Sequence, residues 1–181
     1  MSIYKKTFSS CLVLMSSLLL ISCNQSSSDN QSISTADSGA SVVAGKTGPT
    51  VALSSSEVSV YEGETYSLDI VMSDFTISEG GGVTLRFDPA LLQVVNVTVD
   101  GNVWDFKNKD GRINNAEGSV SDILFSSYQG VSGDAKVATV EFKSIAKGSS
   151  AITLVESSVN SFAGDGQKIV VAFNATTVVS N

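Results

Sequence analysis

Residues 66–72, Tyr-Ser-Leu-Asp-Ile-Val-Met, decide the fold class of this 181-residue chain. Every second position from Tyr66 to Met72 carries a large apolar side chain, and smaller or polar residues stand between them. Successive side chains of a strand point to opposite faces, so this period of two indicates a strand with one buried face. The same alternation recurs at 83–87, 95–99, 138–142 and 169–173.

Turn signals separate these runs. They include Glu62-Gly63, three glycines at 80–82, Asp88-Pro89, Asp110-Gly111 and a Gly-rich stretch at 130–134. Such residues supply the backbone conformations that tight turns require. No window of about a dozen residues shows the 3.6-residue period of an amphipathic helix. The pattern predicts an all-β domain of roughly nine short strands, packed as a two-sheet sandwich.

Composition excludes several classes of function. The formal net charge of -7 argues against binding of nucleic acid or anionic lipid by the folded part. Histidine is absent, which excludes Ser-His-Asp, Cys-His and zinc-histidine sites. The carboxylates are scattered, and neither a phosphate-binding glycine loop nor a nucleophile elbow is present. The sequence therefore predicts a protein that is not an enzyme and needs no cofactor.

The N-terminal segment has the pattern of a secretory signal. Lys5 and Lys6 precede an apolar run that is too short to span a bilayer comfortably. The run ends at Leu-Ile-Ser before Cys23, which resembles the lipobox of bacterial lipoproteins. The alternative is an ordinary cleavage site with a chance cysteine. The resemblance implies a signal peptide at 1–22, lipidation of Cys23, and, because Asn24 follows, an outer-membrane lipoprotein facing the periplasm or the cell surface.

The segment that follows consists mostly of polar or small residues. Residues 23–50 are rich in Ser, Asn, Asp, Gly and Ala and hold almost no large apolar side chain. Such a stretch buries too little surface to offset the entropy of ordering it. We therefore expect a tether at 23–50 and one folded domain at 51–181.

Several segments of the domain together resemble the cohesin family. Residues 81–95, GGVTLRFDPALLQVV, resemble a strand that ends in an aromatic-Asp-Pro turn and leads into a Leu-Leu-x-Val strand. Residues 123–127 (ILFSS), 130–134 (GVSGD) and 137–143 (VATVEFK) resemble the later paired strands around a Gly-rich turn. The resemblance implies a nine-stranded jelly-roll sandwich, related to carbohydrate-binding modules, that docks dockerin domains and serves polysaccharide breakdown. Leu124 stands at the family's docking leucine, whereas Gly82 and Ser127 replace acidic residues.

Two surface regions are candidates for binding. Strand alternation puts Ile123 and Phe125 inside and leaves an apolar side chain among polar ones on an outer face. The side chains predicted for this face are Thr84, Arg86, Asp122 and Leu124. An arginine there suits bidentate contact with a carboxylate. Single exposed leucines are also ordinary, so the bland interpretation stays open.

The second candidate is an aromatic platform. Trp104 and Phe106 are two positions apart and are predicted to share one face of a short strand, where flat rings suit stacking on sugars. The competing interpretation places both rings in the core.

Residues 108–117, NKDGRINNAE, resemble the later part of a calcium loop. Asn108, Asp110, Asn114 and Glu117 stand at ligand positions of the pattern, but Phe106 replaces its first aspartate. Asp110-Gly111 is also a strong hairpin signal. We predict a turn between strands at this place, with a calcium site as the alternative.

These observations lead to two functional hypotheses. The first is a lipid-anchored, non-catalytic binding module that recognises a dockerin-type protein or a polysaccharide at the cell surface. The second is a structural or adhesive spacer of the bacterial envelope without a specific ligand.

Overall fold

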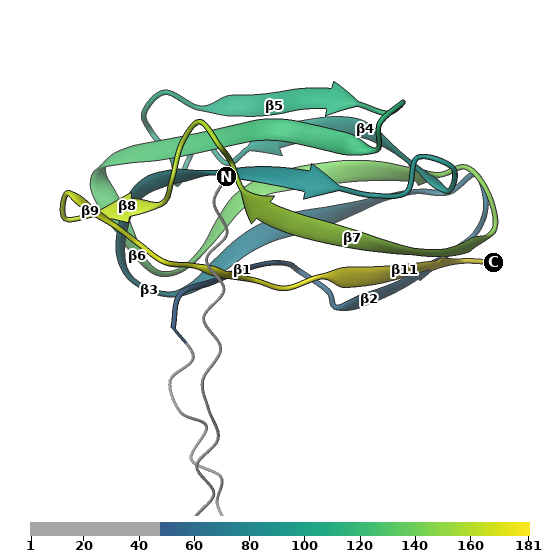
Figure 1. The fold of residues 1–181 in the computed structure, drawn as a ribbon, viewed down its shortest axis with the longest axis horizontal. Helices are drawn as coiled ribbons and strands as arrows, with labels where there is room; N and C mark the ends of the chain where they lie inside the picture. The colour runs from purple at the N-terminus through teal and green to yellow at the C-terminus, as the bar shows by residue number, and fades with distance from the viewer. Residues whose placement is uncertain (1–47) are drawn as a thin grey trace, which may run out of the picture. The chain divides into compact units, whose positions relative to one another are not determined.

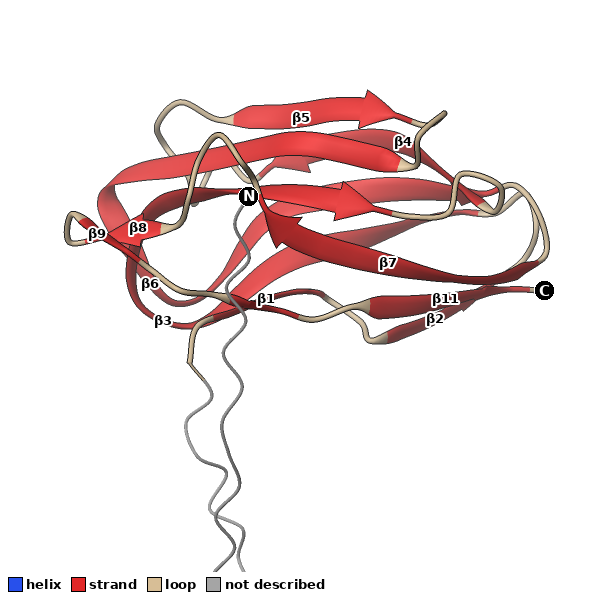
Figure 2. Ribbon diagram, viewed as in Figure 1, coloured by secondary structure: helices blue, strands red, loops and turns tan. Residues whose placement is uncertain are grey.

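A computed structural model of the protein describes residues 48–181, and every regular element in that range is a strand (Figures 1 and 2). The all-β prediction is confirmed. The predicted signal peptide (1–22), Cys23 and all but the last residues of the predicted tether (23–50) lie outside the described residues. Residues 48–181 contain no helix with the length and apolar character that a membrane span requires.

Eleven strands form in the described residues, where the sequence predicts nine. Three of them are only two residues long, and two others are long enough to bend and serve both layers of the sandwich, so the count depends on where bent strands are divided. The strands are β1 (Thr50–Leu53), β2 (Glu57–Val60), β3 (Thr65–Arg86), β4 (Leu92–Val99), β5 (Lys109–Asn114), β6 (Ser119–Ser144), β7 (Gly148–Glu156), β8 (Ala163–Gly164), β9 (Gln167–Lys168), β10 (Ala172–Phe173) and β11 (Thr176–Ser180).

A long antiparallel ribbon of β3 and β6 organises the fold. The two strands pair from Thr65↔Lys143 to Arg86↔Ser119, and both curve over at one end of the molecule (Figure 1). Register shifts between Met72 and Gly80 mark the bend of β3. Gly130 and Gly133 have positive φ of 71° and 76° on the facing part of β6, a conformation that glycine adopts without steric cost. The glycines thus allow the ribbon to turn from one layer into the other.

Each layer is built around one half of the ribbon. In the first layer the order is β10, β1, the first half of β3, the second half of β6, and β4. In the second layer the order is β5, the first half of β6, the second half of β3, β7, β11 and β2. The short β8–β9 hairpin pairs with β3 beside the bend, at Gly80. This is a sandwich whose layers share their two central strands.

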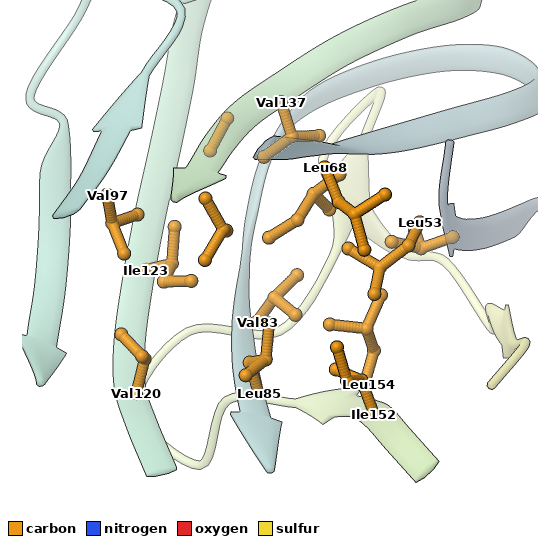
Figure 3. Packing of buried hydrophobic residues seen from close by; sticks show 14 of the residues in the cluster. Leu53, Leu68, Val83, Leu85, Val97, Val120, Ile123, Val137, Ile152 and Leu154 are labelled. Atoms are coloured by element: carbon orange, nitrogen blue, oxygen red, sulfur yellow. The ribbon is translucent and has the colours of Figure 1, made fainter. Parts of the chain in front are cut away.

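A single hydrophobic core lies between the layers. Leu68 and Val97 enter it from the first layer, and Val83, Ile123 and Leu154 enter it from the second (Figure 3). The alternating residues that predict the strands are those that fill this core. Burying a side chain of this size stabilises the fold by roughly 1.5–3 kcal/mol, so the core accounts for much of the driving force.

Two details of the predicted alternation are wrong. Val95 is 52% exposed, because a register shift between Val94 and Asn96 turns it outward while Val97 and Val99 stay buried. At 169–173, only Ala172 and Phe173 form a strand. A bulge is set by pairing with a distant strand, so the local pattern does not reveal it.

The Tyr66 hydroxyl leads to a prediction about alkaline pH. The ring stacks on Phe142, and among the described residues its buried hydroxyl oxygen has no hydrogen-bond partner. Burial raises the pKa of Tyr66 to about 12 from 10.0. The folded state therefore favours the protonated phenol, and this contribution to stability is complete below pH 10 and is lost as pH rises toward 12.

We expect Tyr66→Phe to keep or raise the free energy of unfolding at pH 7, by up to about 1 kcal/mol, since it removes an unpaired polar group. Urea unfolding at several pH values checks this result. The variant should also lose part of the decline in stability above pH 10. A loss of more than about 1 kcal/mol at pH 7 would show that the hydroxyl has a stabilising partner.

Candidate functional site

The outer face of the second layer carries the residues that the sequence predicts for it. Ile123 and Phe125 are fully buried, and Leu124 between them is half-buried and points to the other side of the sheet. Strand pairing sets Leu124 opposite Lys109 of β5 and Gly82 of β3. We call this surface of β5, β6 and β3 the outer face.

Two adjacent hollows on the outer face bring the predicted residues together. Thr84 and Arg86 line one hollow, and Asp122 and Leu124 line the next. Arg112 of β5 borders both and so joins them. The structure therefore places all four predicted side chains on one continuous surface.

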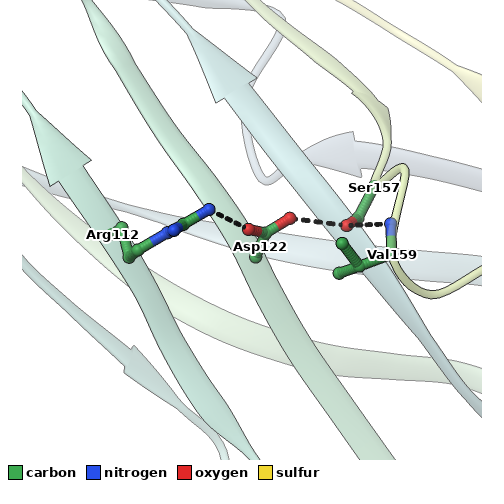
Figure 4. Close-up of polar contacts among 4 residues, drawn as sticks. All are labelled: Arg112, Asp122, Ser157 and Val159. Carbon is green, nitrogen blue, oxygen red and sulfur yellow. Dashed lines mark hydrogen bonds and ion pairs between the residues drawn. The ribbon is translucent and has the colours of Figure 1, made fainter.

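A polar network crosses the outer face through Asp122 (Figure 4). Arg112 forms an ion pair with Asp122 at 2.5 Å, and the Ser157 hydroxyl donates to the other carboxylate oxygen at 2.9 Å. The backbone N–H of Val159 donates in turn to the Ser157 hydroxyl at 3.3 Å. Asp122 has a positive φ of 58°, a conformation that aspartate tolerates better than most residues. The network links β5 and β6 to the segment after β7.

Arg112 is a residue that the sequence analysis missed. Arg86 is the one arginine that the sequence predicts for this face, and the structure adds Arg112, which forms an ion pair with Asp122. The β5–β6 turn lies at 115–118, and it sets Arg112 opposite Ser121, next to Asp122. Asp110-Gly111, which the sequence predicts to be the turn, lies within β5, so that prediction is wrong. Locating the turn at the later Asn-Asn-x-x-Gly would have revealed the pair.

The loop after β7 covers the part of the outer face around Gly82. The N–H of Ser157 donates to the Gly82 carbonyl at 2.8 Å, and the Asn160 side-chain amide donates to the Gly81 carbonyl at 3.1 Å. A Cβ atom at position 82 would stand 2.7 Å from Leu124 Cδ2 and 2.8 Å from Ser157 Cβ. Glycine is therefore required for this loop to lie where it does.

Glu156 holds the end of the same loop. Its carboxylate accepts the N–H of Phe162 at 3.2 Å and forms an ion pair with Lys168 at 3.0 Å. Partial burial pulls the pKa of Glu156 upward, but the hydrogen bonds from Lys168 and Phe162 outweigh it and leave the pKa below its usual value. These contacts fix the loop at both ends.

Trp104 does not belong to any surface platform. Its side chain is 0% exposed, its ring packs edge-on against Phe125 at 4.5 Å, and its indole N–H donates to the carbonyl of Lys136 at 2.9 Å. Residues 103–108 form turns and irregular backbone rather than the predicted strand, so Trp104 and Phe106 do not share a strand face. The competing interpretation of Trp104 as a core residue is correct.

Phe106 instead pairs with Tyr128 at the end of the outer face. Their ring centroids are 4.1 Å apart, and Tyr128 is 75% exposed. The two rings border an open hollow of about 430 Å³ that also touches Leu124. The Lys107 ammonium lies 5.1 Å from the Phe106 ring centroid, within the range of a cation–π contact.

The loop that carries Phe106 is tied to β6. The N–H of Phe106 donates to the Ser126 carbonyl at 3.0 Å, and the Ser126 hydroxyl donates back to the Phe106 carbonyl. The N–H of Tyr128 donates to the Asp105 carboxylate at 3.2 Å. These bonds hold the aromatic pair in place before any ligand binds.

Three of the four residues of the calcium alternative accept backbone N–H groups with their side-chain oxygens. Asn108 accepts the N–H of Ser126, Asp110 accepts that of Val99 at 2.7 Å, and Asn114 accepts that of Glu117 at 3.2 Å. Asp110 and Asn114 lie at opposite ends of β5. Within residues 48–181, no group of three or more Asp, Glu, His or Cys side chains is arranged to hold a metal ion. The sequence pattern is explained by strand and turn contacts.

Comparison with solved structures identifies the fold. A type I cohesin–dockerin complex from Clostridium thermocellum matches with a TM-score of 0.60 and 10% identity, covering 75% of this chain and 100% of that one. The seventh ScaB type I cohesin of Pseudobacteroides cellulosolvens matches at 0.57 and 18%, covering 74% and 92%. The chain has the cohesin fold. It matches no protein-family model and no curated protein sequence.

The cohesin fold is not confined to cellulosome components. A non-cellulosomal cohesin from the archaeon Archaeoglobus fulgidus matches with a TM-score of 0.54 and 17% identity, covering 75% of this chain and 92% of that one. Within the cohesin fold, this chain places Gly82 and the loop at 157–160 where the resemblance leads us to expect an exposed aspartate. The outer face of this chain therefore differs at position 82 from the face that the resemblance leads us to expect.

Proposed function

We propose that this chain is a non-catalytic binding module of the cohesin type that docks a dockerin-like protein on its outer face. The observation that carries the proposal is the half-buried Leu124, which lies between two hollows and is flanked by Arg112 and Asp122. An apolar side chain surrounded by polar groups on an open, rigid sheet is typical of the centre of a protein interface.

Two of the matched cohesins support a protein partner. The Clostridium thermocellum structure is a cohesin–dockerin complex, and so is a matched ScaC cohesin of Acetivibrio cellulolyticus bound to the ScaB dockerin. Their sequence identities to this chain are 10% and 18%, so the likeness concerns the fold alone. That this chain binds the same kind of partner is our proposal.

The setting of the module is also a proposal. The lipobox-like sequence before Cys23 and the polar segment at 23–50 support a lipid-anchored module on a flexible tether, and Asn24 supports the outer membrane. A module in that position would hold its partner near the cell surface. We propose that the partner there takes part in polysaccharide breakdown.

A polysaccharide ligand is the second candidate, and one observation favours it. The exposed ring of Tyr128, supported by Phe106, presents a flat apolar surface beside the polar side chains of Ser127 and Asn160. Such an arrangement suits sugar stacking. The predicted platform at Trp104 is lost, which leaves a smaller surface than the sequence led us to expect.

Substitution of Leu124 tests the docking face. Leu124→Asp removes the central apolar contact and places a charge in its stead, so we expect binding to a dockerin to weaken about 30-fold, or about 2 kcal/mol. Calorimetric titration of the purified chain with a panel of dockerin domains measures the effect. Thermal unfolding should first show that the variant is folded.

Val95→Asp is the matched control, because Val95 is exposed on β4 of the other layer. It should leave binding unchanged. If Val95→Asp weakened binding as much as Leu124→Asp, the outer face would not be the docking surface. Capture of a polysaccharide with no dockerin binding would support the second candidate, and no binding at all would support a spacer.

A further inference from the structure

Positive side chains gather on the outer face of an otherwise acidic protein. The formal charge of the whole chain is -7. Arg86 and Arg112 line one hollow of the outer face, Arg112 and Lys109 line the next, and Lys107 borders the third. The same hollows are lined by the acids Glu79, Asp122 and Glu117, so the outer face holds one more cation than acids in a protein that is acidic as a whole.

Three of these cations have no acidic partner within the described residues. The ion pairs there join Arg112 to Asp122, Lys136 to Asp100, and Lys168 to Glu156. Arg86, Lys107 and Lys109 take part in none of them. Of the acidic groups that line the hollows, Asp122 is paired with Arg112, while Glu79 shares a hollow with Lys107 and Glu117 shares one with Arg86.

Apolar side chains lie among these cations. Leu124 is half-buried at the centre, Val159 is 64% exposed beside it, and Ile113 is 41% exposed in the hollow that holds Arg86. A surface of this kind combines an apolar centre with surrounding cations, three of which have no ion-pair partner within the described residues. When charges around an apolar contact are opposite in sign to those of the partner, they raise the association rate. They also disfavour partners whose charge has the same sign as the surface.

We propose that the part of the partner that contacts the outer face is an acidic amphipathic segment; this inference rests on the proposed function. Its apolar ridge would lie over Leu124 and Val159, and its carboxylates would meet Arg86, Lys109 and Lys107. Arginine binds a carboxylate with two parallel hydrogen bonds, which gives orientation as well as charge. The aspartate that the cohesin resemblance leads us to expect on this face is absent, because Gly82 stands in its place under the loop at 157–160. A basic partner would therefore find no carboxylate at this position.

Two synthetic peptides test the inference. Each is an amphipathic helix of about 20 residues with leucines at i, i+3, i+4 and i+7, flanked by Glu in one peptide and by Lys in the other. We expect the purified chain to bind the Glu peptide at least roughly tenfold more tightly in fluorescence anisotropy, and high salt should remove most of this preference.

Charge reversal locates the effect. Arg86→Glu together with Lys109→Glu should abolish or invert the preference for the Glu peptide. Lys143→Glu together with Lys147→Glu is the matched control with the same change in net charge, since both lysines are exposed and Lys143 lies in the part of β6 that belongs to the first layer. The control should keep the preference.

Each other result overturns the inference. Equal binding of both peptides, tighter binding of the Lys peptide, no binding of either, or tighter binding of polygalacturonate than of the Glu peptide would each do so. This inference can fail while the proposed function stands: a dockerin that binds through Leu124, without sensitivity to Arg86→Glu and Lys109→Glu, would leave docking intact and refute only the acidic partner.

Discussion

Trp104→Ala is expected to lower the free energy of unfolding by about 3–5 kcal/mol, one of the largest effects of any single substitution in this chain. The side chain is fully buried, and its ring lies 4.5 Å from that of Phe125. Truncation would leave a large cavity and would also leave the Lys136 carbonyl without the indole donor it now accepts from. Denaturant unfolding followed by circular dichroism measures the change.

Trp104→Phe separates the two contributions. A phenyl ring keeps most of the packing against Phe125 but cannot donate to Lys136, so we expect a loss of about 1–3 kcal/mol. Since Trp104 touches no ligand surface, neither variant should change partner affinity at temperatures where it remains folded. A binding defect in fully folded Trp104→Phe would return this residue to the binding site.

Gly118→Ala is the second substitution with a large expected effect. Gly118 closes the β5–β6 turn with a φ of +63°, and a Cβ atom there would collide with the Phe87 carbonyl oxygen and stand 2.7 Å from Cδ of Pro89. Backbone strain costs about 1–2 kcal/mol, and overpacking adds about 1–3 kcal/mol. We therefore expect a total loss of about 2–5 kcal/mol in urea unfolding.

Gly166→Ala is the matched control for this substitution. Gly166 has nearly the same φ, +68°, but a Cβ atom there would meet nothing within 4 Å. It should show only the strain of about 1–2 kcal/mol. Equal losses in the two variants would mean that the contact with Phe87 and Pro89 relaxes without cost.

The sequence predicts the class of fold because the core depends on simple alternation. Tyr66 to Met72 alternate as a strand must, and the core cluster follows that pattern from strand to strand. The placing of Leu124 between two buried residues follows from the same rule. Predictions of this kind succeed where a local period decides which face a side chain occupies.

Predictions failed where distant strands decide the local geometry. Asp110-Gly111 has the composition of a hairpin turn, and Gly111 does adopt a positive φ of 89°, yet both residues lie within β5, where Asp110 pairs with Ile123 of β6. Arg112 was overlooked for the same reason, since its position beside Asp122 depends on the true turn. Trp104 lies in irregular backbone, where no period reveals which way a side chain points.

The shared β3–β6 ribbon has a consequence for how the domain comes apart. Because each layer borrows its two middle strands from the same pair, neither sheet is a separable folding unit. Loss of pairing at one end of the ribbon must propagate through the bend to the other. Residues as far apart as Thr65 and Lys143 have to meet before the first layer is complete, and such long loops close slowly. A slow, all-or-none transition is the behaviour that this connectivity imposes, and a bound partner on one layer would slow the opening of both.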